Sequence, residues 1–248
     1  MAKSKRTRKS RTKSIKKEIS ISIACEDSAG GLKYITELIK SYGFIPKNTC
    51  LNKNFTDLKG LVEQVLNEKN LKIVFVDVDD KLKSQGNKNN VNSGIQKARN
   101  NNICIIVSNE CLELWFLLHF EEQTTFINRY EIFKKLKKHL LNHKKNVLPK
   151  NTIHNLEQNK IKNIDWFMIL DNNEKELAIK RCKKLIKSKS PLNPWKENPI
   201  TLMCCFIDFL EKISAINNNI KLTQKEKKNK ILETFQKCYP ITGMEINV

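Results

Sequence analysis

The sequence lacks any apolar run near the roughly 18 residues that a membrane-spanning helix needs. No apolar signal core follows its basic N-terminus. Its eight cysteines include no Cys-x-x-Cys pair, and several stand within apolar runs, as buried free thiols do. No Gly-Lys-Ser/Thr loop is present, so the chain is not expected to be its own ATPase. These absences predict a cytoplasmic protein with no membrane segment.

Acidic residues are also scarce, since 26 Asp and Glu stand against 46 Lys and Arg, for a formal charge of +20. Such an excess favours a polyanionic partner such as nucleic acid, although a chain so rich in Lys and Asn carries part of this charge as solvated surface. The basic segment 1–17 has almost no apolar content and is expected to be disordered. It is either a solubilising tail or a nucleic-acid-binding arm.

Apolar patterns predict three strands, at 19–25, 73–76 and 103–107. Helices are expected after Gly31 to about Gly43, from an N-cap at Thr56, and briefly near 94–100, whereas 81–94 is expected to be an exposed loop. Strands that alternate with helices predict an α/β fold with a parallel sheet and right-handed crossovers.

The second half of the chain is expected to be mainly helical. Helical patterns cover 110–120, 130–142, 174–187, 199–213 and 225–237. A chain of 248 residues suffices for one generous domain or two small ones. The predicted organisation is a tail at 1–17, an α/β core at 18–125, and a helical C-terminal extension at 126–248 that packs on the core.

The few carboxylates follow strands. Glu26 comes directly after the first predicted strand, and Asp77, Asp79 and Asp80 follow the second. Open α/β sheets bind ligands beyond the carboxyl ends of their strands, and carboxylate oxygens suit Mg²⁺. In extended backbone Asp77 and Asp79 face one side, while Glu26 precedes a helix whose N-terminal N–H groups suit a phosphate. The alternative is that these residues merely begin polar loops.

Two polar residues interrupt the apolar helix expected at 110–120. An unpaired buried charge is costly, so Glu113 should meet a cation, a metal ion or a hydrogen-bond donor. His119 is interpreted as a hydrogen-bonded core histidine. Further along, His139 and His143 have the i, i+4 spacing of a zinc pair but stand among lysines, which favours a basic face that includes Tyr130 and Phe133.

Four segments resemble the RloB family of bacterial proteins linked to abortive phage resistance and restriction loci. Cys25-Glu26 precedes Tyr34 at the family's spacing, and Val76-Asp77-Val78-Asp79 matches its second motif. The most specific likeness lies in 108–120, where Ser-Asn, Cys, Glu-Leu-Trp and Leu-His-Phe all match. Asn-Pro-Ile-Thr at 198–201 resembles a fourth motif, so that the likeness spans about 19–213.

The resemblance implies a Toprim-like, Rossmann-like core, shared with topoisomerases, primases and the nucleases of OLD-type systems. Glu26 would then be the acid/base or a metal ligand, and Asp77 and Asp79 would bind Mg²⁺, with Mn²⁺ as the alternative. Asp80 and Glu113 are secondary candidates. The implied protein is an antiviral effector of abortive infection, a nuclease of RNA or DNA that a partner ATPase controls.

The chain also departs from the family pattern. The family's second carboxylate after the first strand falls on Gly31. Asp27 could substitute for it, although its position is different, and the family's proline after Ser-Asn is replaced by Glu110. These differences leave a second hypothesis open. In it the chain is a non-catalytic nucleic-acid-binding or regulatory subunit of the same defence complex.

Overall fold

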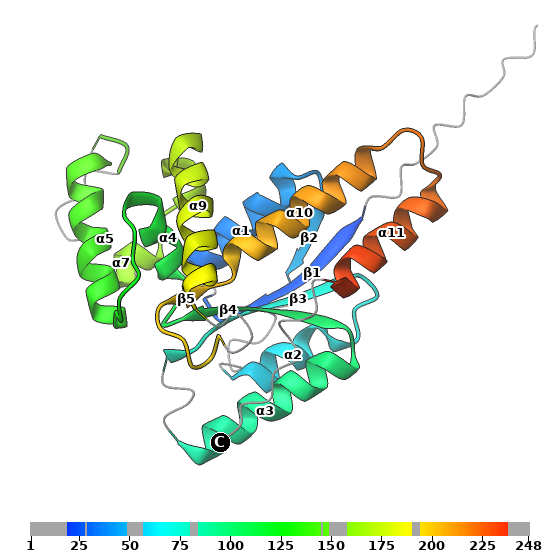
Figure 1. The fold of residues 1–248 in the computed structure, drawn as a ribbon, viewed down its shortest axis with the longest axis horizontal. Coiled ribbons are helices and arrows are strands. Elements are labelled where there is room, and N and C mark those ends of the chain that lie inside the picture. The colour runs from blue at the N-terminus through cyan, green and yellow to red at the C-terminus, as the bar shows by residue number, and fades with distance from the viewer. Residues whose placement is uncertain are drawn as a thin grey trace, which may run out of the picture.

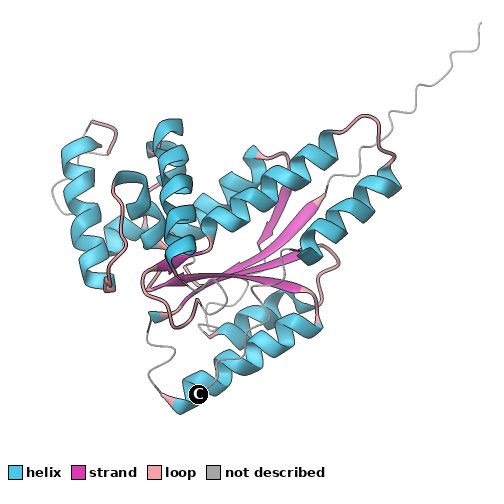
Figure 2. Ribbon diagram, in the orientation of Figure 1, coloured by secondary structure: helices cyan, strands magenta, loops and turns pink. Residues whose placement is uncertain are grey.

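A five-stranded sheet crosses the protein, and helices cover both of its faces (Figure 1, Figure 2). The computed structural model describes residues 19–27, 29–48, 57–79, 84–144, 146–148, 158–189 and 194–237. The strands are β1 (Ser20–Cys25), β2 (Ile45–Asn48), β3 (Leu71–Asp77), β4 (Ile103–Asn109) and β5 (Ile200–Thr201). Their order is β2-β1-β3-β4-β5; the first four are parallel, and β5 pairs antiparallel with β4. The predicted α/β class with a mainly parallel sheet is confirmed.

Two pairs of helices enclose the sheet. In Figure 1, α1 (Gly30–Ser41) and α10 (Met203–Asn218) lie on one face, and α2 (Leu58–Leu66) and α3 (Gln85–Asn100) on the other. Phe75 of β3 meets Phe206 of α10 edge-on, with ring centroids 5.0 Å apart. Because both faces are covered, the central strands β3 and β4 are apolar at almost every position.

The remaining helices gather mostly at the carboxyl end of the sheet (Figure 1). They are α4 (Glu113–Phe120), α5 (Arg129–His143), α7 (Gln158–Lys162), α8 (Trp166–Ile169) and α9 (Asn172–Ser188), while α11 (Gln224–Lys237) packs on α10. Phe116 of α4 stacks on Trp166 of α8 at 4.4 Å and meets Tyr34 of α1 edge-on at 5.2 Å. This aromatic cluster joins the helical half to the sheet domain.

The loop expected at 81–94 is wrong from Gln85 onward, because α3 runs from Gln85 to Asn100, whereas residues 81–83 lie outside the described residues. Ser84 caps this helix by accepting a hydrogen bond from the Asn87 backbone at 3.2 Å. The helix buries Val91, Gly94, Ile95 and Ala98 and leaves its first turns in solvent, which explains their polar composition. The buried residues form a narrow stripe in an otherwise polar segment, so the sequence shows no clear helical period of apolar residues there.

Other boundaries also differ from the expected ones. The helix expected to begin at Thr56 is capped by Asp57, whose side chain accepts from the Gly60 backbone at 2.7 Å. The edge strand β2 was not predicted, since it is short, largely exposed and contains Pro46. The last core helix begins at Met203 instead of 199, because β5 precedes it. Thr56 itself and the basic segment 1–17 lie outside the described residues.

The C-terminal half contributes directly to the sheet domain, since β5 extends the sheet and α10 covers one face. The proposed division at 125/126 stays a prediction. Within the described ranges, no helix combines the length and the apolar character needed to cross a bilayer.

Candidate functional site

Glu26 and Asp77 lie at the topological switch point of the sheet, between the carboxyl ends of β1 and β3. From β1 the chain first moves to β2 on one side and then crosses to β3 on the other. In open α/β sheets of this strand order, the crevice between β1 and β3 is the usual ligand site. The Glu26 backbone donates to the Phe75 carbonyl at 3.3 Å, and its side chain accepts from the Asp77 backbone at 3.3 Å. The two residues therefore lie side by side at the carboxyl edge.

Asp77 is buried, with 6% of its surface exposed. Its Oδ1 accepts a hydrogen bond from the Leu112 backbone at 2.9 Å, and its Oδ2 meets Arg129 Nη2 at 2.8 Å. The same Arg129 nitrogen lies 2.5 Å from Asp79 Oδ2. Asp77 and Asp79 therefore contact one cation, the Arg129 side chain, while their predicted binding of one metal ion stays a prediction.

The backbone brings Asp79 to this position by a turn. Asp79 has φ of 39°, in the left-handed region that Asp tolerates better than most residues. Its N–H donates to the Glu110 carbonyl at 3.1 Å, and the Val78 N–H donates to the Ser108 carbonyl at 3.0 Å. The expected extended conformation of 77–79 is thus wrong, although both carboxylates still converge.

Glu113 adds a fourth carboxylate to the site. It is 1% exposed, and among the described residues no donor reaches either of its oxygens with hydrogen-bonding geometry. Burial raises the pKa of Asp77 well above its usual value, and the negative charges of Glu113 and Glu26 raise it further, against the lowering effect of Arg129. The site therefore holds more buried negative charge than Arg129 compensates.

The donor set suits a hard divalent cation, which binds carboxylate oxygens, and the orphaned Glu113 carboxylate leaves negative charge for it to neutralise. Across the described parts of the chain, however, no three His, Cys, Asp or Glu side chains are already arranged as ligands of one ion. Glu26 and Asp79 are partly exposed, whereas Asp77 and Glu113 are buried. Asp80, a secondary candidate, lies outside the described residues. Metal binding by this cluster stays a prediction.

Arg129 was missed by the sequence analysis. It occupies the first turn of α5, where the helix dipole disfavours a positive charge. That unfavourable position is the only signal in the sequence that Arg129 has an anionic partner.

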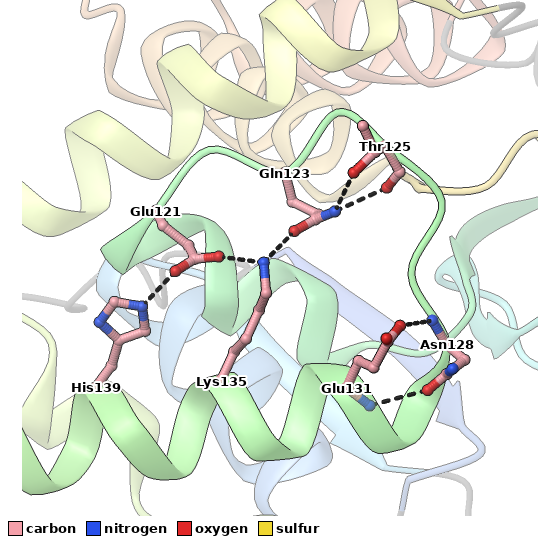
Figure 3. Close-up of polar contacts among 7 residues, drawn as sticks. All are labelled: Glu121, Gln123, Thr125, Asn128, Glu131, Lys135 and His139. Atoms are coloured by element: carbon pink, nitrogen blue, oxygen red, sulfur yellow. Dashed lines mark hydrogen bonds and ion pairs between the residues drawn. The ribbon is translucent and has the colours of Figure 1, made fainter.

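The N-terminus of α5 is held firmly in place. Asn128 and Glu131 form a reciprocal capping box, in which the Asn128 side chain accepts from the Glu131 backbone at 2.9 Å (Figure 3). The Ile127 backbone donates to Asn198 Oδ1 at 3.1 Å. The backbone at Arg129 is therefore fixed both within its helix and from the 198–201 segment.

Lys135 of α5 fixes the connection from α4 (Figure 3). It donates to Glu121 at 2.6 Å and to Gln123 at 2.7 Å. His139 contacts the other Glu121 oxygen at 2.7 Å and stacks on Phe120, which accounts for the histidine without a zinc ion. The expected basic face is narrower than predicted, because Phe133 is buried; its exposed members are Tyr130, Lys134, Lys137 and Lys138.

The third and fourth motifs meet in space. Ser108 and Thr201 share a hydrogen bond of 2.8 Å between their hydroxyls across β4 and β5. Asn198 donates to Glu110 at 3.1 Å, and Asn109 donates to the Trp195 carbonyl at 3.2 Å. These buried and partly buried contacts fix the end of β4 and the segment that follows it, beside the acidic residues.

The start of α1 is crowded at Gly31, where the family pattern has a second carboxylate. The Asp27 side chain accepts hydrogen bonds from the backbones of Ala29, at 3.0 Å, and Gly31, at 2.8 Å, so it satisfies one N–H group in the first turn of the helix. A Cβ at Gly31 would lie 2.5 Å from a Leu112 methyl group and 2.6 Å from Asp27. Asp27 therefore faces the start of the helix and occupies the Gly31 N–H, instead of replacing the missing carboxylate.

His119 is a buried core histidine, as interpreted from the sequence. Its Nδ1 lies 2.9 Å from the Trp115 carbonyl, which only an N–H can satisfy, so the proton is assigned to Nδ1. Burial lowers its pKa to about 3, and the charges of Lys175 and Arg181 act in the same direction.

His119 predicts an acid-sensitive fold. Because its folded-state pKa is depressed, its stabilising effect is complete above its ordinary pKa of 6.5 and is lost as the pH falls toward 3. The free energy of unfolding should fall by roughly 1.4 kcal/mol for each pH unit below that value. Urea unfolding at pH 7.5 and pH 5.5 measures this loss of stability. His119→Gln should no longer show the loss, whereas His143→Gln, a change at an exposed position, should still show it. Equal acid sensitivity in all three proteins would contradict the assignment.

Comparison with known proteins gives one match. The model of the RloB family, described as RloB-like protein, matches residues 21–210. Neither the curated proteins nor the solved structures include a match. The matched region contains every carboxylate of the acidic site and all five strands except the first residue of β1. The chain belongs to the RloB-like family.

Proposed function

We propose that this protein is a metal-dependent nuclease of an antiphage defence system, cleaving phosphodiester bonds in RNA or DNA. The observation that carries the proposal is the surplus of buried carboxylates at the β1/β3 crevice of a chain with a charge of +20. A basic protein that buries Asp77 and Glu113 beside Glu26 and Asp79 loses stability unless a cation joins them.

Glu26, Asp77 and Asp79 would hold Mg²⁺, or Mn²⁺ in its place. The chemistry supplied by such an ion is stabilisation of the negative charge that develops on the phosphate during in-line attack. Glu26 is partly exposed and would accept the proton of the attacking water or hydroxyl. The buried Asp77, held by the Leu112 backbone, orients the cluster. Exposed lysines draw the polyanion to the protein surface.

The test is cleavage of RNA and of plasmid DNA by the purified protein, with Mg²⁺ or Mn²⁺ and with a chelator. Glu26→Gln should lower the cleavage rate at least about 100-fold, since it removes the proton acceptor. Glu176→Gln makes the same chemical change at an exposed position of α9 and should leave the rate unchanged. Cleavage that persists in chelator, or that survives Glu26→Gln, would exclude the proposed mechanism.

We also propose that a partner ATPase controls the nuclease, since the chain carries no phosphate-binding loop of its own. The assay is therefore repeated with the product of the neighbouring reading frame and ATP. Activation or inhibition that requires ATP hydrolysis supports this control, and an unchanged rate argues against it.

The second candidate function is a non-catalytic nucleic-acid-binding or regulatory subunit. It is favoured by Gly31, where no carboxylate fits, and by Arg129, which already neutralises part of the cluster. If RNA and DNA bind but remain intact with the partner present, and Glu26→Gln binds them as tightly as the unaltered protein, this function is the better account.

A further inference from the structure

We propose that Arg129 is the resident cation of the acidic site, and that a divalent ion binds by displacing its guanidinium from Asp77 and Asp79. This inference rests on the proposed metal site and concerns its regulation. In this view the metal-free protein is closed by its own arginine, and every binding event at the carboxylates is an exchange of cations.

The first argument is geometric. A single nitrogen, Nη2, contacts both carboxylates, at 2.8 Å from Asp77 and 2.5 Å from Asp79. The guanidinium nitrogen thus stands at the point where the two carboxylate groups converge. A metal ion and the Arg129 Nη2 atom therefore cannot both occupy the point between these carboxylate oxygens.

The second argument is that Arg129 is held incompletely. Arginine pairs most strongly with a carboxylate through two parallel hydrogen bonds, whereas here one nitrogen serves two carboxylates. Its Nε is buried and, among the described residues, has no hydrogen-bond partner. A buried donor left unsatisfied costs free energy, which lowers the barrier to moving the side chain away.

The third argument comes from the helix. Arg129 lies in the first turn of α5, where the dipole repels a positive charge, while Asn128 and Glu131 already cap the helix. The helix therefore gains nothing from the position of the guanidinium, which is held by Asp77 and Asp79 together with the buried Cys111 side chain. The Arg129 side chain is 29% exposed, so it has an open edge toward solvent into which it can swing.

The fourth argument is the charge balance. Asp77 feels the negative charges of Glu113, Glu26 and Asp79 and the positive charge of Arg129 alone among its main influences. One positive charge leaves the cluster underneutralised, whereas a divalent ion supplies two. The exchange therefore favours the ion once its concentration is sufficient, and Arg129 sets that concentration.

The experiment measures the affinity for Mg²⁺ and Mn²⁺ by titration calorimetry on the full chain. If Arg129 occupies the site in more than about nine-tenths of the molecules, its removal should tighten binding at least about tenfold. Arg129→Gln should therefore lower the dissociation constant tenfold or more. Arg99→Gln removes the same charge from an exposed position on α3 and should leave it unchanged.

A thermal readout covers the case in which Arg129→Gln folds poorly. Without metal this variant leaves Asp77 and Asp79 facing each other, so it should unfold at a lower temperature than the unaltered protein, and saturating Mn²⁺ should restore it. Arg129→Lys keeps the charge and should bind the ions about as the unaltered protein does, which separates loss of charge from loss of packing.

The outcomes distinguish this inference from the proposed function. Binding of Mn²⁺ that Asp77→Asn abolishes, combined with unchanged or weaker binding in Arg129→Gln, overturns the exchange and leaves the metal site standing. Absence of binding in both the unaltered protein and Arg129→Gln overturns the inference and the metal site together. Tighter binding in Arg129→Gln, with Arg99→Gln and Arg129→Lys unchanged, supports the exchange.

Discussion

Asp77→Asn should lower metal-dependent cleavage by about 1,000-fold or more and at the same time raise the unfolding temperature of the metal-free protein. Activity should fall because a metal ion stabilises the charge of the transition state by several kcal/mol, and this stabilisation is lost with the ion. Asp77 is the most buried of the three proposed ligands of that ion. The gain in stability follows because the variant no longer buries this negative charge beside Glu113 and Glu26.

The sign of the stability change depends on pH. Burial, Glu113 and Glu26 raise the folded-state pKa of Asp77, so its contribution to stability is complete below its ordinary pKa and is lost as the pH rises through the raised value. Asn lacks that loss and can still accept from the Leu112 backbone. The gain should therefore appear at neutral pH and vanish in acid. About 1 kcal/mol corresponds to roughly 2–4 °C in a chain of this size.

Thermal unfolding and cleavage are measured on the same preparations, with Asp208→Asn as the matched control. Asp208 lies on α10 and pairs with Lys183 at the surface, so its loss should change stability by less than about 1 kcal/mol and leave cleavage intact. If Asp77→Asn instead destabilises the protein and retains activity, Asp77 is a structural residue and not part of a metal site.

Gly30→Ala should destabilise the protein by about 3 kcal/mol or prevent folding. A Cβ at this position would lie 2.1 Å from the Lys162 carbonyl oxygen and 2.9 Å from that of Ile164. Both are backbone atoms, which cannot move aside as the end of a flexible side chain can. Overpacking of this kind costs about 1–3 kcal/mol and occasionally more. It would also separate α1 from α7 and α8 at the carboxyl end of the sheet.

Gly86→Ala is the matched comparison. Gly86 lies in the first turn of α3, and a Cβ there meets nothing within 4 Å. Because alanine favours a helix over glycine, this variant should be neutral or more stable by up to about 1 kcal/mol. Urea unfolding at pH 7.5 measures both. A similar small effect for the two variants would mean that α1 and the 162–164 segment are not in the close contact described.

The sheet was predictable because its central strands are buried on both faces. Continuous apolar runs at 73–76 and 103–107 identify β3 and β4 without any knowledge of tertiary contacts. Glu26 and Asp77 were predictable for the same reason, since each follows a recognisable strand, and parallel strands end at one edge. The end of a strand can be located from the local pattern of apolar residues, without knowledge of tertiary contacts.

Features that depend on distant partners were not predictable. Arg129 stands 52 residues from Asp77, and its unfavourable place in the first turn of α5 indicates an anionic partner without identifying it. Asp27 was considered as a replacement carboxylate, but its short distance to the helix start made backbone capping the stronger interaction. Helix α3 was hidden because a helix that touches the protein along a narrow stripe can be almost wholly polar.

The order in which β4 and β5 occur along the chain has a consequence for folding during translation. Strand β5 and Asn198 supply the contacts that fix Ser108, Asn109 and Ile127, yet they emerge from the ribosome nearly 100 residues after β4. A nascent chain that stalls before residue 198 has its carboxylates but not the contacts that position them. The acidic site therefore reaches the arrangement described here only after residue 201 has been translated and β5 has paired with β4.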